Sequence, residues 1–165
     1  MPRTPSIARI LALSLVLAAC GDDDEDDAKP VDVVVMTRNV FLGADLGPAI
    51  GSQSVSGFVA ATGGILRQVT ATDFATRAKG LAAEIAEIQP DLVGLQEVAM
   101  WRTGETSVEP LYGIRPKASN VRYDFLELLL AELDAAGRHY EAVVIQEQFD
   151  FEAPADENQL AGDGF

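Results

Sequence analysis

The order of two strand-like segments around a helix-like segment constrains the fold more than any other feature of this sequence. The segment VDVVVMTRNV, residues 31–40, is β-branched and almost continuously apolar, which is typical of a strand covered on both faces. The segment DLVGLQEV, residues 91–98, has the same character but runs into the charged residue Glu97. Apolar residues recur at helical spacing from Phe74 to Ile88. We therefore expect a strand, a helix and a second strand in that order.

The central helix has one apolar face, formed by residues at three- and four-residue steps: Phe74, Ala78, Leu81, Ile85 and Ile88. The same spacing places three charged residues at outward positions: Arg77, Glu84 and Glu87. Thr72 or Asp73 can cap the start of the helix, and Pro90 ends it because proline disfavours a helical conformation at the preceding residue.

The remaining chain continues this alternation. Residues 41–73 are rich in Gly, Ser, Ala and Thr, and a connection of this length usually contains short helices or serves a site. Residues 99–121 show no sustained period and are expected to form a second loop. Asp124 and Glu127 stand three apart, as in a capping box, and open a helix that stops at Gly137. HYEAVVIQEQF, residues 139–149, is predicted to be a third strand, and residues 152–165 a polar, irregular tail.

Strands alternating with helices predict an α/β fold in which helices pack on a sheet. In open sheets of this kind, ligands gather beyond the carboxyl ends of the strands. Asn39 lies at the end of the first predicted strand and Glu97 at the end of the second. We therefore expect both polar side chains to emerge at the same rim.

These segments carry a family resemblance. VVVMTRNVFLGADL, the amphipathic helix and QPDLVGLQEV together resemble the amino-terminal half of the endonuclease/exonuclease/phosphatase superfamily. MWRTG, YDFLELLLAEL and YEAVVIQE are similar to that family's next helix and strand, so the resemblance spans Val31 to Phe151. It implies part of a four-layer αββα sandwich, namely the first β-sheet with its helices, in an incomplete domain. It also implies metal-dependent phosphodiester hydrolysis.

By this resemblance, Glu97 binds a catalytic Mg²⁺ or Mn²⁺, and Asn39 sits beside the metal and helps to position it or the phosphate. Magnesium prefers oxygen ligands and usually takes one or two carboxylates with water and substrate phosphate, so a rim glutamate suits it. Two plainer interpretations stay open. Glu97 can cap a nearby helix or pair with an arginine such as Arg102, and Asn39 can be a turn residue.

The sequence also departs from the family pattern. Members complete their site with a later aspartate and asparagine one residue apart and with a carboxy-terminal aspartate–histidine pair. Asp156 and Asn158 have the first spacing, but no apolar strand precedes them, which indicates coincidence. The only histidine, His139, is expected at a helix end. The resemblance therefore implies a truncated, inactive or weakly active form, with an exposed sheet face through which chains self-associate.

The amino terminus predicts export. Arg3 and Arg9 precede the apolar run ILALSLVLAA, and residues 1–19 have the build of a signal peptide. LAAC resembles the lipobox of bacterial lipoproteins, which implies lipid on Cys20 and a membrane-anchored place in the cell envelope; a free thiol in a secreted protein is the alternative. Residues 20–30 contain consecutive acids from Asp22 to Asp27 and read as an acidic tether or, less simply, a calcium site.

The net charge of the chain limits the classes of molecule that it is expected to bind. The net charge of −14 disfavours non-specific binding to duplex DNA. The loop after Glu97 is locally positive, and together with the acidic body and the predicted envelope location it favours small phosphodiesters, lipid head groups or extracellular nucleic acid as substrates. Arg102 and Arg115, in the loop after Glu97, are candidates for phosphate binding. Asp45 is either a further site residue or a helix cap. A lipid-anchored binding or scaffolding module without catalysis is the alternative function.

Overall fold

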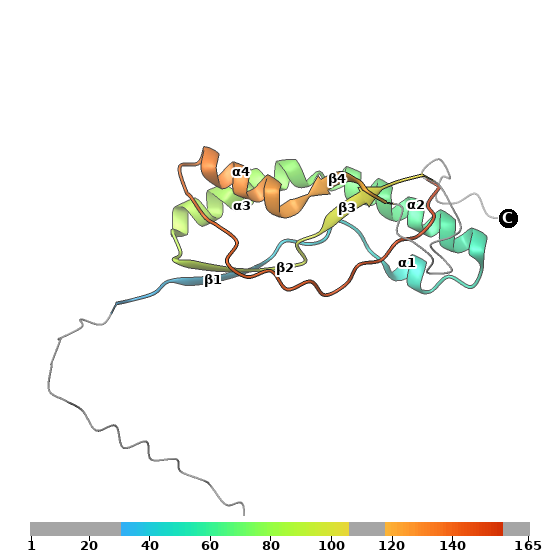
Figure 1. Ribbon diagram of the computed structural model, residues 1–165, viewed down its shortest axis with the longest axis horizontal. Coiled ribbons are helices and arrows are strands. Elements are labelled where there is room, and N and C mark those ends of the chain that lie inside the picture. The colour runs from blue at the N-terminus through green and yellow to red at the C-terminus, as the bar shows by residue number, and fades with distance from the viewer. Residues whose placement is uncertain (1–30, 106–117, 157–165) are drawn as a thin grey trace, which may run out of the picture. The chain divides into compact units, whose positions relative to one another are not determined.

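The computed structural model describes residues 31–105 and 118–156, which form a mixed α/β arrangement with four helices and two two-stranded sheets (Figure 1). The described residues from Asp32 onward belong to one compact unit. In chain order the elements are β1 (Val35–Asn39), α1 (Gly47–Ile50), α2 (Val55–Ala71), α3 (Phe74–Ile88), β2 (Leu92–Gln96), β3 (Met100–Thr103), β4 (Asn120–Asp124) and α4 (Phe125–Ala135).

The predicted strand–helix–strand unit is confirmed. β1 and β2 pair in parallel, with Val35 opposite Leu92 and Asn39 opposite Gln96. Asp73 caps α3, since its Oδ1 accepts a hydrogen bond from the Thr76 N–H at 3.2 Å. α3 ends at Ile88, and the left-handed backbone of its C-cap residue Gln89 (φ 54°) leads directly into Pro90.

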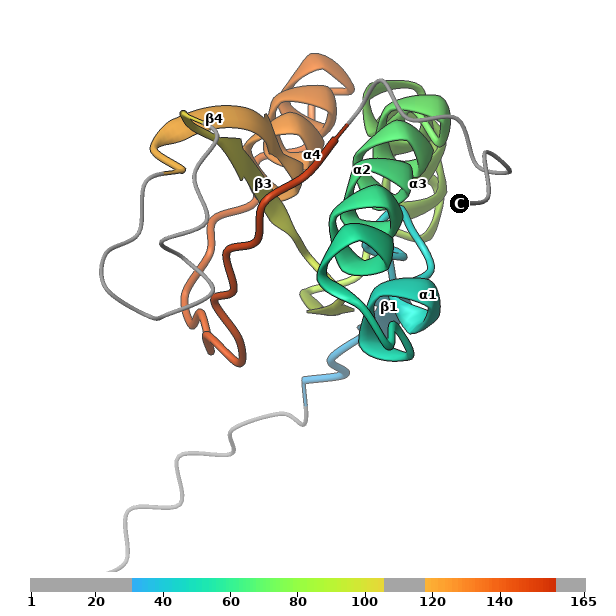
Figure 2. The same cartoon turned by 90° about the vertical axis from the view of Figure 1, so that its right-hand side faces the viewer.

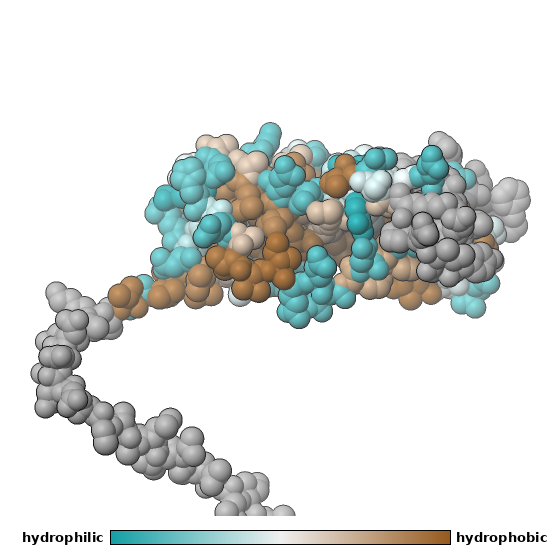
Figure 3. Space-filling view, in the orientation of Figure 1, coloured by the Kyte–Doolittle hydropathy of each residue, from teal (hydrophilic) through white to brown (hydrophobic). Residues whose placement is uncertain are grey.

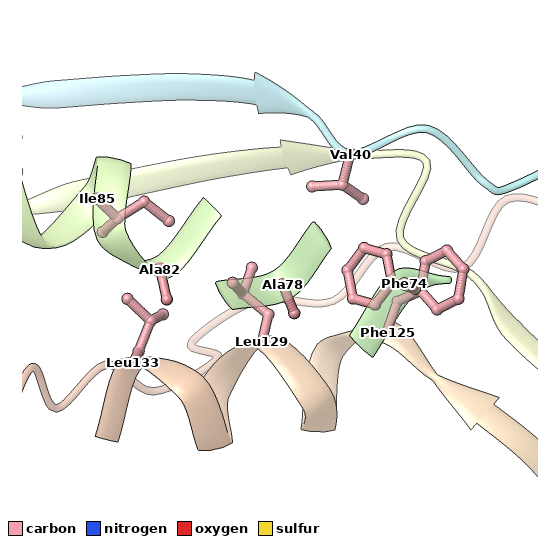
Figure 4. Close-up of a cluster of buried hydrophobic side chains, with 8 residues drawn as sticks. All are labelled: Val40, Phe74, Ala78, Ala82, Ile85, Phe125, Leu129 and Leu133. Carbon is pink, nitrogen blue, oxygen red and sulfur yellow. The ribbon is translucent and has the colours of Figure 1, made fainter. Parts of the chain in front are cut away.

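The main core lies between α3, α4 and the β1–β2 pair. Its eight buried residues are shown in Figure 4: Val40, Phe74, Ala78, Ala82, Ile85, Phe125, Leu129 and Leu133. The rings of Phe74 and Phe125 stack with centroids 3.7 Å apart, and Val40 lies above them. Met36 of β1 and Val93 and Leu95 of β2 pack against this cluster. α3 and α4 therefore cover one face of the parallel pair.

A second, smaller cluster fixes α2. Ile65 and Val69 of α2 are buried with Ala44, and Trp101 packs against them. Ser54 caps the helix by accepting a hydrogen bond from the Gly57 N–H at 3.1 Å. The prediction of short helices between residues 41 and 73 holds for α1 but not for α2, which is 17 residues long. Adjacent Gly63 and Gly64 lower its intrinsic propensity, so packing of its apolar face supplies the stability that propensity lacks.

The predicted second loop contains regular structure. β3 and β4 pair antiparallel, with an irregularity in register between Trp101 and Arg102. α4 follows β4 directly (Figure 2) and begins as predicted, because Asp124 accepts a hydrogen bond from the Glu127 N–H at 3.0 Å. Gly137, with φ 72°, follows its end. The irregular register interrupts alternation along β3, which is why the sequence shows no period there.

The predicted third strand is wrong. Residues 139–151 lie in the described part of the chain and form neither helix nor strand. Contacts fix both ends of the segment, because the Tyr140 hydroxyl donates to the carbonyl of Pro90 and Arg102 pairs with Asp150. An apolar, β-branched run becomes a strand only where a neighbouring backbone completes its hydrogen bonds, and sequence period alone does not supply that neighbour.

The end of the described chain packs on α2 (Figure 2). Pro154 is buried, and the Asp156 N–H donates to the carbonyl of Val59 at 3.3 Å. The backbone of Asp156 approaches Gly63 so closely that a Cβ built there would lie 1.8 Å from the Asp156 carbonyl oxygen. The start of the predicted tail is irregular, as expected, but it makes close contact with the fold.

The second face of the β1–β2 pair is open. Val35 is 61% exposed and its cross-strand partner Leu92 is 54% exposed. Val143, Val144 and Ile145 of the irregular segment are also exposed, and hydrophobic side chains gather on the face seen in Figure 3. The expected exposed apolar surface is therefore present in the described residues.

The predicted signal peptide, Cys20 and the acidic tether lie outside the described residues. Within residues 31–105 and 118–156, no helix has the length and apolar character needed to cross a bilayer.

Candidate functional site

Asn39 and Glu97 meet at the carboxyl ends of β1 and β2. The parallel register places Asn39 opposite Gln96, the residue before Glu97. The Asn39 Nδ2 group donates a hydrogen bond to Glu97 Oε1 at 2.7 Å, although the two residues are 58 positions apart in the chain. The prediction that both side chains emerge at one rim is confirmed.

The backbone after β1 turns around this pair. The Phe41 N–H donates to Asn39 Oδ1 at 2.8 Å, and the Leu42 N–H donates to Glu97 Oε2 at 3.1 Å. The Val40 N–H continues the sheet by donating to the Gln96 carbonyl at 2.9 Å. Asn39 thus accepts through oxygen and donates through nitrogen, and this arrangement fixes the orientation of its amide.

Glu97 and the neighbouring Phe41 adopt left-handed backbone. Phe41 has φ 56° and Glu97 has φ 57°. Such values are uncommon for residues other than glycine and are least favourable for bulky side chains. Local strain of this kind persists only where surrounding contacts hold it, and it is concentrated at functional sites.

The contacts of Glu97 favour the ionised form of its carboxyl group. The hydrogen bond from Asn39 lowers the pKa of the Glu97 carboxyl, and the backbone hydrogen bond from Leu42 lowers it further, whereas slight desolvation opposes both. The carboxylate is exposed to solvent. It therefore stays negatively charged at neutral pH and remains accessible to a cation or a phosphate-bearing molecule with a bound cation.

The oxygen donors of this pair suit a hard divalent cation. Each carboxylate oxygen of Glu97 accepts one hydrogen bond and retains capacity for a second interaction. Magnesium is commonly held by one or two carboxylates, with waters and substrate phosphate completing its shell. The described part of the chain contains no group of three or more His, Cys, Asp or Glu side chains arranged to hold a metal. Glu97 is thus a single protein carboxylate suited to an open, largely hydrated site.

The plainer interpretation of Glu97 as the partner of Arg102 is wrong. Arg102 lies on β3, and its guanidinium pairs with Asp150. The hydrogen bond that the Arg102 guanidinium donates to Asp150 raises the pKa of Arg102, and the charges of Asp150, Glu152 and Glu147 add to the effect. The predicted phosphate-binding role of Arg102 would require exchange of Asp150 for a phosphate. Arg115, the other candidate, lies outside the described residues.

The remaining candidates lie elsewhere. Asp45 Oδ1 accepts a hydrogen bond from the N–H of Gly47, the first residue of α1, at 2.8 Å, but the N-cap position belongs to Leu46, so Asp45 does not cap the helix. His139 is exposed after α4 and contacts Asp134 at 2.8 Å, in agreement with the helix-end prediction. Asp156 packs on α2, and Asn158 lies outside the described residues.

Two residues that contact the site were missed from the sequence. Arg77 was predicted to face outward, but it is half-buried and donates to the carbonyls of Val40 and Phe41. Trp101 donates from Nε1 to the carbonyl of Leu42 at 2.9 Å. A signal for Arg77 exists: it follows Phe74 by three residues, a spacing that places both on one side of the helix. No pattern around Trp101 indicates its partner.

Comparison of the chain with protein-family models, with curated proteins and with solved structures finds no match in any of the three. A functional assignment therefore depends on the chemistry of the Asn39–Glu97 pair and on the sequence pattern that contains it.

Proposed function

We propose that this chain carries part of a metal-dependent phosphodiesterase site of the endonuclease/exonuclease/phosphatase type. In this proposal Glu97 binds Mg²⁺ or Mn²⁺, and Asn39 orients the carboxylate and lies beside the metal. The observation that carries the proposal is the 2.7 Å hydrogen bond between Asn39 and Glu97 at the ends of two parallel strands. A scaffold protein has no need for an exposed, oriented carboxylate at this position.

The chemistry follows from the anionic, exposed state of Glu97. When bound, the cation would polarise a phosphoryl oxygen and stabilise the charge that develops during displacement. Asn39 and the Leu42 N–H fix the carboxylate before the cation arrives, so less reorganisation is needed on binding. Small phosphodiesters, lipid head groups and extracellular nucleic acid remain the proposed substrates, since the proposed lipid anchor at Cys20 would hold the chain at the cell envelope.

The finer fold belongs to the same proposal. α3 and α4 cover one face of the parallel β1–β2 pair, and the opposite face is exposed. This agrees with the first sheet and helix layer of a four-layer αββα sandwich, in which the second sheet would cover the exposed face. The full site in this class has further aspartate, asparagine and histidine groups. We therefore expect the chain alone to turn over phosphodiesters slowly or not at all.

Metal binding is the direct test of the proposal. Equilibrium dialysis with Mn²⁺ on the full chain should reveal a bound equivalent that disappears in Glu97→Gln, which keeps the side-chain size but removes the charge. Glu84→Gln is the matched control, because Glu84 is also a partly exposed glutamate and pairs with Arg38 at 2.9 Å. Equal Mn²⁺ binding by wild type and Glu97→Gln would contradict the proposal and favour the non-catalytic binding module.

Hydrolysis provides a second test. Bis-p-nitrophenyl phosphate is incubated with the purified chain in the presence of Mg²⁺ or Mn²⁺, and nitrophenolate release is followed by absorbance. Any turnover should require the divalent cation and vanish in Glu97→Ala. Robust turnover that survives Glu97→Ala would overturn the assignment of Glu97.

A further inference from the structure

The three residues after Asn39 present their carbonyl groups away from the Asn39–Glu97 pair. Their N–H groups are used by Gln96, Asn39 and Glu97, as described above. Their carbonyls accept from two other side chains: Arg77 Nη1 to Val40 at 2.6 Å, Arg77 Nη2 to Phe41 at 3.2 Å, and Trp101 Nε1 to Leu42 at 2.9 Å. Every backbone polar group of residues 40–42 therefore has a partner, and the turn has one defined position.

Arg77 is itself held in place. Its Nε donates to the carbonyl of Thr72 at 3.0 Å, so three nitrogens of one guanidinium bind three backbone carbonyls. The guanidinium carbon lies 4.9 Å from the centroid of the Phe74 ring and 5.6 Å from that of Phe41. This planar group thus connects the buried aromatic stack of α3 and α4 to the turn after β1.

Trp101 is anchored by packing on both sides. Its side chain packs against the main core cluster and against the smaller cluster formed by α2. A rigid, two-sided contact leaves the indole N–H little freedom, so the Leu42 carbonyl has a fixed partner. The Leu42 N–H at the other end of the same residue orients Glu97.

We propose that Arg77 and Trp101 are positioning residues for the Asn39–Glu97 pair. They hold the carbonyl side of residues 40–42, so that the N–H side presents fixed donors to Glu97 and Asn39. Only the Mn²⁺-affinity measurement depends on the proposed function; the positioning role itself does not. Without these two side chains the strained backbone at Phe41 relaxes, and the Leu42 N–H no longer points at the carboxylate.

The test uses two conservative variants and one matched control. Arg77→Lys keeps the charge but replaces a rigid fork with a point donor, and Trp101→Phe keeps an aromatic ring but removes the N–H. Arg38→Lys is the control, because Arg38 also connects β1 to α3, through Glu84, without touching the turn. The measurements on the full chain are amide hydrogen exchange at Leu42, Mn²⁺ affinity and the midpoint of urea unfolding.

Both site variants should speed Leu42 exchange and weaken Mn²⁺ binding about tenfold or more, the loss that supporting contacts of metal ligands typically cause. Arg38→Lys should change neither the Leu42 exchange rate nor the Mn²⁺ affinity, even if it lowers the midpoint of urea unfolding as much as the two site variants do. Unchanged amide exchange at Leu42 in Trp101→Phe would overturn the inference. If Arg77→Lys does not fold, the result for Trp101→Phe decides the question by itself. If wild type binds no Mn²⁺ at Glu97, the proposed function fails, and Leu42 exchange still decides the positioning role.

Discussion

Two segments of the chain, one after β1 and one after α4, show opposite relations between sequence and structure. Residues 40–42 have little regular pattern, yet each of their backbone polar groups has a partner in β1, β2, β3 or α3, or in Glu97 just after β2. Residues 141–149 have a strong strand pattern, yet the structure places them in no sheet, with Val144 83% exposed. Position in the fold is therefore determined by available partners, and a favourable local pattern is insufficient.

The two regions contribute to the molecule in different ways. The turn after β1 lies between a buried core and an exposed carboxylate. Its contacts with the core hold the Leu42 N–H in place, and this N–H in turn orients Glu97. The irregular segment contributes exposed apolar surface beside the open face of the sheet. Substitutions in the core and turn should consequently affect stability and the proposed metal binding, whereas substitutions in residues 141–149 should affect neither strongly.

The largest effect is expected at the core beneath the turn. Phe125 is fully buried and stacks on Phe74, so Phe125→Ala removes this contact and should reduce the free energy of unfolding by about 3–5 kcal/mol. Phe149 is 77% exposed, and Phe149→Ala should cost less than about 1 kcal/mol. Urea denaturation measures both. Similar losses of stability at the two phenylalanines would show that the core and the irregular segment do not differ in their contribution to folding.

A smaller loss is expected at Gly43, where the turn meets α2. Its φ of 106° is unfavourable for other residues, and a Cβ would lie 3.3 Å from Thr72 Oγ1 and 3.4 Å from Val69. Gly43→Ala should therefore reduce the free energy of unfolding by more than about 1 kcal/mol. Thermal unfolding by circular dichroism checks this expectation. A variant as stable as wild type would show that the turn is less constrained than the contacts indicate.

Gly80→Ala should have the opposite sign. Gly80 lies inside α3, and apart from its chain neighbours and the backbone of its own helix no atom lies within 4 Å of a Cβ built there. Alanine should therefore raise the free energy of unfolding by about 0.5–1 kcal/mol, and it should leave Mn²⁺ affinity unchanged because the turn is untouched. Urea denaturation and a Mn²⁺ titration of the same sample test both statements. A fall in stability would contradict the assigned helix.

The smallest effect concerns pH. Because the pKa of Glu97 is lowered in the folded state, the unfolded chain binds this proton more readily. The stability that the carboxylate contributes is thus present above its unfolded pKa, about 4.3, and is lost as the pH falls through the lower folded value. Carbon-13 NMR of the Glu97 carboxyl should give a midpoint below the ordinary value of a glutamate carboxyl, and Asn39→Ala should raise it. A wild-type midpoint at or above the ordinary value would contradict the hydrogen bonds described.

Several elements followed from the sequence because their causes are local. The period and the Asp73 cap define α3, and the Asp124–Glu127 spacing defines the start of α4. The proximity of Asn39 and Glu97 also followed, since the ends of adjacent parallel strands share a rim. These features depend on spacing that a one-dimensional pattern records.

Other elements were not predictable because their causes are tertiary. The charge of Arg77 predicts exposure to solvent, whereas three carbonyls and three aromatic rings hold the side chain inward. The β3–β4 pair has a shifted register that hides its alternation, and α2 depends on packing more than on propensity. Residues 139–149 have the composition of a strand, but composition does not specify the neighbour that a strand requires.

The central claim is that Glu97, oriented by Asn39 and the Leu42 N–H, is where a divalent cation binds. Paramagnetic broadening by substoichiometric Mn²⁺ in the nitrogen–proton NMR spectrum of the full chain tests it most directly, because broadening falls steeply with distance from the ion. We expect the Asn39 side-chain amide and the Leu42 amide to broaden first, and both to stay sharp in Glu97→Gln. Broadening confined to the acidic run Asp22–Asp27, with the Asn39 and Leu42 signals unaffected, would contradict it.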